Sequence, residues 1–222
     1  PSDPKLYGQD FSVADAVAVL RHLGIARAHV VGLSMGAFAA VLFGIRHPEM
    51  ASAIVAAGVG SGSPRAEQAA FRAQCREKGD ALIAEGWVGA QAEETGNSPT
   101  RIQLRKKDPR GWAAYMERLA QHSGPGTGLT MKHYQGERDS ILDWEAELRR
   151  LAVPTLLAVG DEDWPCIETN IFLKKVLPSA GLWMHPRTGH AINLEEPAAF
   201  NAAVARFFST VERGRWSLDA TG

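Results

Sequence analysis

A serine between two glycines is the first residue of this sequence whose type and spacing could do chemistry. Ser34 lies in the pattern Gly32-Leu33-Ser34-Met35-Gly36, between a short apolar run and an alanine-rich run. A strand before such a serine and a helix after it predict a sharp turn that exposes the hydroxyl over the amino end of the helix. We interpret both glycines as positions where the turn leaves no room for a side chain. The pattern predicts a nucleophilic serine, although the same motif alone can be a plain turn.

A base and an acid that could assist this serine follow later in the chain. A serine hydroxyl is a poor nucleophile at neutral pH unless a base takes its proton. Imidazole suits that role, and a carboxylate fixes its tautomer and orientation. His190 follows the last predicted strand, while Asp161, Glu162 and Asp163 follow the strand before it. Since functional groups gather beyond the carboxyl ends of parallel strands, we expect Ser34, His190 and one of these acids to meet there.

Two further residues near this predicted site are alternatives for the same roles. His185 stands at a strand end before Pro186, where a structural histidine is the simpler interpretation. Cys166 follows the acids without a base beside it in the sequence, so we interpret it as a small buried apolar residue. The other histidines show no metal-ligand spacing. The sequence therefore predicts neither a metal nor a cofactor.

The elements that must position these residues alternate in type along the chain. Residues 25–33 and 53–57 form predicted strands, and the predicted helix 37–45 lies between them. Strand, helix and strand at this spacing predict a parallel βαβ unit. A capping pattern at residues 12–15 predicts an earlier helix that ends at Gly24.

The parallel pattern returns near the end of the chain. Residues 153–160 form a nearly continuous apolar strand, and residues 182–184 form the last predicted strand. Predicted helices at residues 167–176 and 197–213 follow them, and the second of these has an apolar face.

Between these two parts, residues 64–150 have a different character. Helical patterns at residues 66–78 and 108–121 are followed by a glycine-rich breaker at residues 124–128. This composition predicts a helical cap over a pocket. Its aromatic and methionine side chains form either the cap's own core or the pocket wall. They are Trp87, Trp112, Tyr115, Met116, Met131, Tyr134 and Trp144.

These motifs resemble the α/β-hydrolase family, in which the chain order is nucleophilic Ser, then acid, then His. The resemblance covers nearly the whole chain, through segments 32–36, 153–165 and 188–197. It implies an α/β fold with a mostly parallel sheet, flanking helices and an inserted helical cap. The implied domains are a hydrolase core at residues 1–63 and 151–222, with the cap at residues 64–150.

The resemblance also assigns roles residue by residue. Ser34 matches the nucleophile and His190 the base. Asp163 matches the acid, because the family's acid usually lies a few residues past the end of its strand. The backbone N–H of Met35 matches one donor of the oxyanion hole. By position alone, Asp161 and Glu162 remain open as the acid.

The amino-terminal part departs from the family. Members normally have further strands before the stretch that opens this chain, and a His-Gly type loop that supplies a second oxyanion donor. We therefore expect the amino-terminal strands to be missing from this chain, which starts at Pro1 without an initiator Met. Without a neighbour, the strand before Ser34 would become a hydrophobic sheet edge, which natural folds avoid.

We predict a serine hydrolase that acts on small carboxylic esters or lactones through an acyl-enzyme. A serine at the turn argues against the dehalogenase and epoxide-hydrolase branches, which use Asp there. Carbon–carbon bond hydrolases and cofactor-free haloperoxidases keep the same triad and remain alternatives. A non-catalytic homologue that only binds a ligand is a second class of alternative.

Composition limits the partners and the compartment. The chain has 222 residues, 45% of them hydrophobic, and a net charge of -1, which favours one domain with an insertion. Without a basic face, no nucleic-acid partner is expected, and Arg101, Arg105, Lys106 and Lys107 are interpreted as a solvated helix face. No apolar run is long enough to cross a membrane. Two cysteines without a disulfide or metal pattern favour a reducing, cytoplasmic compartment. The sequence leaves the oligomeric state open.

Overall fold

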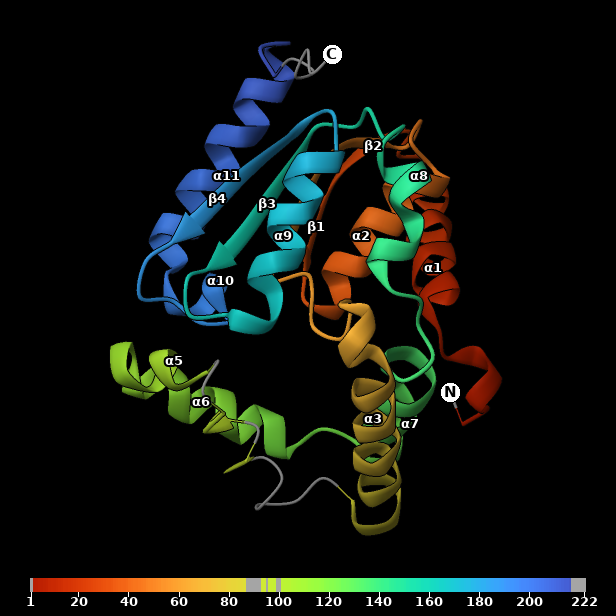
Figure 1. The fold of residues 1–222 in the computed structure, drawn as a ribbon, viewed down its shortest axis with the longest axis vertical. Helices are drawn as coiled ribbons and strands as arrows, with labels where there is room; N and C mark the ends of the chain where they lie inside the picture. The colour runs from red at the N-terminus through yellow and green to blue at the C-terminus, as the bar shows by residue number, and fades with distance from the viewer. Residues whose placement is uncertain (1, 87–92, 95, 99–100, 217–222) are drawn as a thin grey trace.

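The computed structural model describes residues 2–86, 93–94, 96–98 and 101–216 (Figure 1). Their strands form one four-stranded parallel sheet in the order β1-β2-β3-β4. The parallel sheet predicted from the sequence is therefore confirmed. The strands are β1 Ala28–Leu33, β2 Ala51–Ala57, β3 Thr155–Gly160 and β4 Ala180–His185.

The two central strands are buried on both faces, which explains their nearly continuous apolar sequences. Successive side chains of a strand point to opposite faces. Ile54 of β2 accordingly packs into one core, while Val55 packs into the other. In the described part of the chain β1 is an edge strand, and its Val31 is 50% exposed.

Helices cover both faces of this sheet. One core contains Val13 of α1 Gln9–His22, Phe38 of α2 Met35–Arg46 and Leu173 of α9 Trp164–Val176. The opposite core contains Ile192 of α10 Ile192–Glu195 and the phenylalanines of α11 Pro197–Glu212. Figure 1 shows α11 on the other side of the sheet from α1 and α2. This layering leaves the carboxyl ends of the strands as the open edge of the core.

The inserted segment lies beyond these carboxyl ends, where α3, α5, α6 and α7 gather in Figure 1. Its described residues are helical or irregular, without a strand. Its aromatic and methionine side chains have mixed positions. Tyr115, Met116 and Met131 pack on a small cap core, whereas Trp144 packs on the main core. Trp87 lies outside the described residues. The cap boundaries at residues 64 and 150 remain a prediction.

The remaining helices of the described residues are η1 Pro4–Leu6, α3 Arg65–Glu85, α5 Ile102–Lys107, α6 Pro109–Ala120, α7 Gly124–Leu129, η2 Thr130–Gln135, η3 Ile141–Trp144 and α8 Glu145–Leu148.

Two local predictions were wrong. The first helix begins at Gln9 with Gly8 at its N-cap, so Ser12 lies inside the helix and does not cap it. The glycine-rich breaker is itself helix α7, which begins because the side chain of Ser123 accepts the N–H of Gly126 at 3.1 Å. A Cβ at Gly128 would lie 2.6 Å from the backbone oxygen of Gly79 on α3. Glycine in α7 therefore permits close packing of two helices.

The described helices include none that combines the length and apolar character of a membrane span.

Leu157 of β3 tests how strongly the sheet core stabilises the fold. Its side chain is 0% exposed at the centre of the sheet, whereas Leu23, after α1, is 61% exposed. We expect Leu157→Ala to lower the free energy of unfolding by about 2–5 kcal/mol, through lost burial and a cavity. Leu23→Ala should change it by less than about 0.5 kcal/mol. Urea unfolding of both variants measures the difference, and equal losses would contradict this description of the core.

Candidate active site

Ser34 occupies the sharp turn between β1 and α2. Its backbone dihedrals are φ 54° and ψ −117°, in a region that non-glycine residues rarely occupy. A Cβ at Gly32 would lie 2.0 Å from the backbone oxygen of Gly36, so only glycine fits at position 32. A Cβ at Gly36 would meet nothing within 4 Å, and the prediction that crowding requires both glycines was wrong for Gly36. The turn is therefore strained at Ser34 and crowded on one side only.

Met35, predicted as an oxyanion donor, is the first residue of α2. The first N–H groups of a helix have no acceptor within the helix and carry partial positive charge. The backbone oxygen of Met35 accepts a hydrogen bond from the Tyr134 hydroxyl at 3.4 Å, which ties the turn to the cap. Its role as a donor remains a prediction.

His190 and Asp163 meet beyond the ends of β4 and β3. Nδ1 of His190 lies 2.8 Å from Oδ2 of Asp163, and both side chains are buried. Because an ionised carboxylate only accepts hydrogen bonds, Nδ1 carries the proton in the neutral ring. The second ring nitrogen, Nε2, is then left with a lone pair that can take a proton.

The competing acids make other contacts. Oδ1 of Asp161 accepts the backbone N–H of Thr188 at 3.1 Å, and Oε2 of Glu162 accepts the side-chain amide of Gln103 at 2.6 Å. The structure thus brings Asp163 to His190 and gives these two acids different partners. The rival base His185 contacts the hydroxyl of Thr188 at 2.9 Å.

A buried glutamate that the sequence did not single out holds the loop around His190. Glu195 accepts the backbone N–H groups of Gly189 at 2.6 Å and Ala191 at 3.1 Å, on either side of the histidine. These two bonds fix the backbone of His190. The only signal in the sequence was an acidic residue five positions after the histidine. An acidic residue there is equally typical of the start of the following helix.

The basic cluster in the cap was predicted to be a solvated helix face, and Arg105 and Lys106 are indeed exposed. Lys107 and Arg101 have further contacts or positions. Nζ of Lys107 lies 2.6 Å from Oε1 of Glu196 and donates to the hydroxyl of Thr188 at 3.3 Å. Lys107 therefore joins α5 of the cap to the histidine loop of the core. Arg101 lines the cavity described next.

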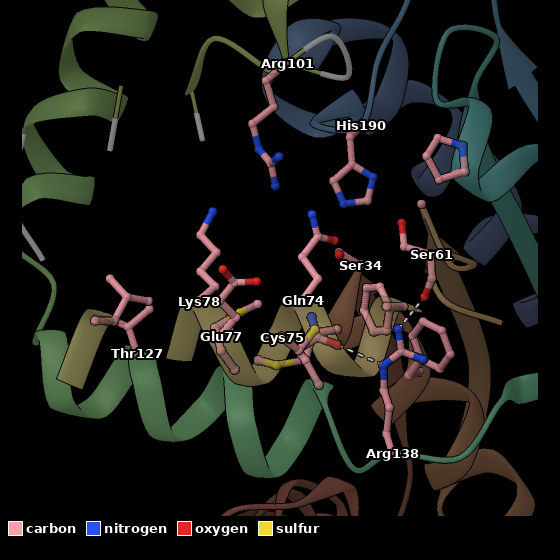
Figure 2. A pocket seen from close by; sticks show the side chains of 18 of the residues that line it. Ser34, Ser61, Gln74, Cys75, Glu77, Lys78, Arg101, Thr127, Arg138 and His190 are labelled. Carbon is pink, nitrogen blue, oxygen red and sulfur yellow. Dashed lines mark hydrogen bonds between the residues drawn. The ribbon is translucent and has the colours of Figure 1, made fainter. Parts of the chain in front are cut away.

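A cavity of about 630 Å³ lies between the core and the cap. The core contributes Ser34, Asp163 and His190, which the structure therefore brings to one cavity. Figure 2 shows side chains of α3, among them Gln74 and Lys78, on the side of the cavity opposite His190. Arg138 also lines this cavity. Arg138 was missed from the sequence, since no motif surrounds it.

Cys166 has a base near it in space, although none is adjacent in sequence. Its Sγ lies 3.9 Å from Nδ1 of His190 and 3.3 Å from the backbone oxygen of Gly58. Sγ and one ligand atom each of Asp163 and His190 lie within 4.8 Å of one another, a donor set that could in principle hold a metal. Burial strongly raises the pKa of the Cys166 thiol, so without a metal the thiol stays protonated. The interpretation of Cys166 as a small buried residue agrees with its 0% exposure.

The comparison with known proteins assigns the fold family. Residues 1–203 match the model of the alpha/beta hydrolase family. The chain therefore belongs to the alpha/beta hydrolase family, and the family resemblance found in the sequence is confirmed.

Individual relatives differ in their chemistry. The chain is 26% identical over 210 residues to a 2-hydroxy-6-oxononadienedioate/2-hydroxy-6-oxononatrienedioate hydrolase of Burkholderia vietnamiensis, covering 89% of this chain and 68% of that protein. It is 28% identical over 196 residues to 3-oxoadipate enol-lactonase 2 of Acinetobacter baylyi, covering 86% and 67%. The solved structure of MenH from S. aureus matches with a TM-score of 0.83 at 16% identity, covering 92% of this chain and 76% of that one. The last likeness concerns the fold alone.

Glu195 makes the stability of the site depend on pH. Burial raises the pKa of its carboxyl above the ordinary value of about 4.5, and the N–H groups of Gly189 and Ala191 offset this only in part. Between these two pKa values the folded state binds more protons than the unfolded state, so this contribution to stability falls as pH rises.

We therefore expect the free energy of unfolding of the wild type, minus that of Glu195→Gln, to fall as pH rises from about 4.5 through the raised pKa. It should be flat below and above this window. Urea unfolding of both proteins at a series of pH values measures the difference. A difference that stays constant or rises would contradict the assignment.

Proposed function

We propose that this protein is a serine hydrolase of small carboxylic esters or lactones, with Ser34 as nucleophile, His190 as base and Asp163 as acid. The observation that carries the proposal is the buried His190–Asp163 pair at 2.8 Å in the same cavity as the strained Ser34. The name of the enol-lactonase relative supports a lactone or ester as substrate.

The first half of the reaction forms an acyl-enzyme. Oγ of Ser34 attacks the carbonyl carbon of the substrate while Nε2 of His190 takes the hydroxyl proton. The carbonyl oxygen becomes an oxyanion that accepts the N–H of Met35 at the amino end of α2. The intermediate collapses, and His190 returns the proton to the departing alcohol oxygen.

The second half releases the acid. A water molecule gives a proton to Nε2 of His190 and attacks the acyl carbon, and the second intermediate expels Ser34 with that proton. In both halves His190 becomes positively charged, and the buried carboxylate of Asp163 stabilises it. The bracing of the histidine backbone by Glu195 keeps this geometry between the two steps.

Covalent labelling tests the nucleophile. A serine-directed phosphonate should give one adduct per chain on Ser34, detected by intact mass and peptide mapping. Ser34→Ala should lose the adduct and reduce kcat on a short ester by at least about a thousandfold. Ser61→Ala, which changes another serine of the same cavity, should keep the adduct on Ser34. An adduct on any other residue, or full activity without Ser34, would refute the assignment.

Amide variants of the three neighbouring acids test which one orients His190. Asp163→Asn should lower kcat by about a hundred- to ten-thousandfold, because the wrong tautomer of His190 is then stabilised. Asp161→Asn keeps an oxygen for the N–H of Thr188, and Glu162→Gln keeps one for Gln103, so each should cost less than about tenfold. Steady-state kinetics on one ester compares all three variants. A loss at Asp161 as large as that at Asp163 would contradict the proposed triad.

A further inference from the structure

Arg138 is a buried cation in the wall of the cavity that contains Ser34. Its side chain belongs to a residue that is only 6% exposed. Within the part of the chain that the structure describes, its hydrogen bonds go to Ser61 and Gln135, and no carboxylate forms an ion pair with it. An unpaired buried charge is costly for a protein, so such a group in a cavity indicates a functional site.

The guanidinium is held in a fixed orientation by neutral groups. One Nη atom donates to the backbone oxygen of Ser61, and Nε donates to Oε1 of Gln135 at 2.8 Å (Figure 2). The group also lies over the ring of Phe38, 3.8 Å from its centroid, and 5.0 Å from that of Phe71. These contacts fix the plane of the guanidinium but leave its charge without an opposite charge.

The guanidinium remains a cation at neutral pH. Burial lowers the pKa of Arg138 to about 10, while the nearby thiols and phenol raise it only in part. Two of its five N–H donors are used by Ser61 and Gln135. The other nitrogen, Nη1, makes no hydrogen bond to any described residue, so it can donate to a ligand.

Arg138 contacts a residue of the helix that begins after the nucleophile. Phe38, on which the guanidinium stacks, is four residues after Ser34 on α2, which is a rise of about 6 Å along a helix. Ser34 and Arg138 line the same cavity. A substrate whose reacting carbonyl is at Ser34 can therefore reach Arg138 with a short carbon chain.

The other charged groups of the cavity wall differ from Arg138. Asp163 is buried but is already paired with His190. Glu77 and Glu94 of the cap are exposed, and Lys78 and Arg101 are partly exposed, so water and salt screen them. Arg138 is accordingly the group of this wall, within the described residues, whose charge a ligand would balance most strongly.

We propose that Arg138 binds a carboxylate of the substrate, so that the enzyme prefers half-esters or lactones of short dicarboxylic acids. A planar guanidinium matches a planar carboxylate, and one buried cation balances one negative charge. The ligand completes a charge pair that the protein leaves open. This inference rests on the proposed ester hydrolase function, but its test includes a binding measurement that does not.

The kinetic test uses two substrates of nearly equal shape. Monoethyl glutarate carries a carboxylate at neutral pH, and ethyl glutaramate carries a neutral amide in its place. The wild type should hydrolyse the acid with a kcat/KM about ten- to a hundredfold higher, mainly through KM, as expected for a charge-assisted bond. Arg138→Gln should lose this preference, because its kcat/KM on the acid falls toward its kcat/KM on the amide.

Two controls separate binding from folding. Arg65→Gln removes an exposed arginine of α3 that pairs with Asp143 and should keep the full preference. Arg138→Lys retains the positive charge but not the planar arrangement of N–H donors, so its preference for the acid should fall to an intermediate value. This variant replaces Arg138→Gln if the latter does not fold. If Arg138 had only a structural role, its substitution would lower kcat/KM for both substrates by the same factor and leave the preference for the acid unchanged.

The binding test distinguishes this inference from the proposed reaction. Calorimetry on Ser34→Ala should show monoethyl glutarate binding about ten- to a hundredfold more tightly than ethyl glutaramate, and the added Arg138→Gln should remove the difference. If neither ester is hydrolysed but this difference is present, the proposed function fails and the carboxylate site stands. Equal binding of acid and amide in Ser34→Ala, or an acid preference that survives in Arg138→Gln, overturns the carboxylate site.

Discussion

The hydrogen bond between His190 and Asp163 joins two loops that are 27 residues apart in the sequence, and much of the fold serves to hold them together. The parallel register of β3 and β4 pairs Gly160 with His185, so both loops begin at the same edge of the sheet. Beyond that edge, the backbone N–H of Glu162 donates to the oxygen of Thr188 at 2.9 Å. The loops are thus connected by backbone contacts before any side chain takes part.

Burial of the pair has a cost that neighbouring groups must offset. A carboxylate without water is stabilised only by hydrogen bonds and opposite charge, and His190 supplies a hydrogen bond in both of its protonation states. The same principle applies at Glu195, whose buried carboxyl group accepts hydrogen bonds from two backbone N–H groups. Two buried carboxylates therefore stabilise one loop, the first through the side chain of His190 and the second through its backbone.

The sequence predicted the elements better than it predicted their contacts. Apolar runs and the turn at Ser34 follow local rules, so the four strands, the helices of the core and the chain order of Ser34, Asp163 and His190 could be proposed from residue types. Two predictions from glycine were wrong, the crowding at Gly36 and the helix breaker that is in fact α7. The reason for a glycine depends on which backbone lies opposite it. Such contacts are set by tertiary structure and leave no periodic signal.

The residues that sequence reasoning missed share a physical property. Glu195, Lys107 and Arg138 are charged side chains whose roles depend on the folded structure. Glu195 accepts two N–H groups of its own loop, and Lys107 pairs with Glu196 across to the core. Arg138 has hydrogen-bond partners but no carboxylate partner among the described residues. A charged residue in a sequence is expected at the surface, and only the folded structure shows that Glu195 and Arg138 are buried. The cation of Lys107 is neutralised by Glu196 across the junction of cap and core. The cation of Arg138 is not neutralised, and this difference separates a charge that stabilises the cap from one that is open to a substrate.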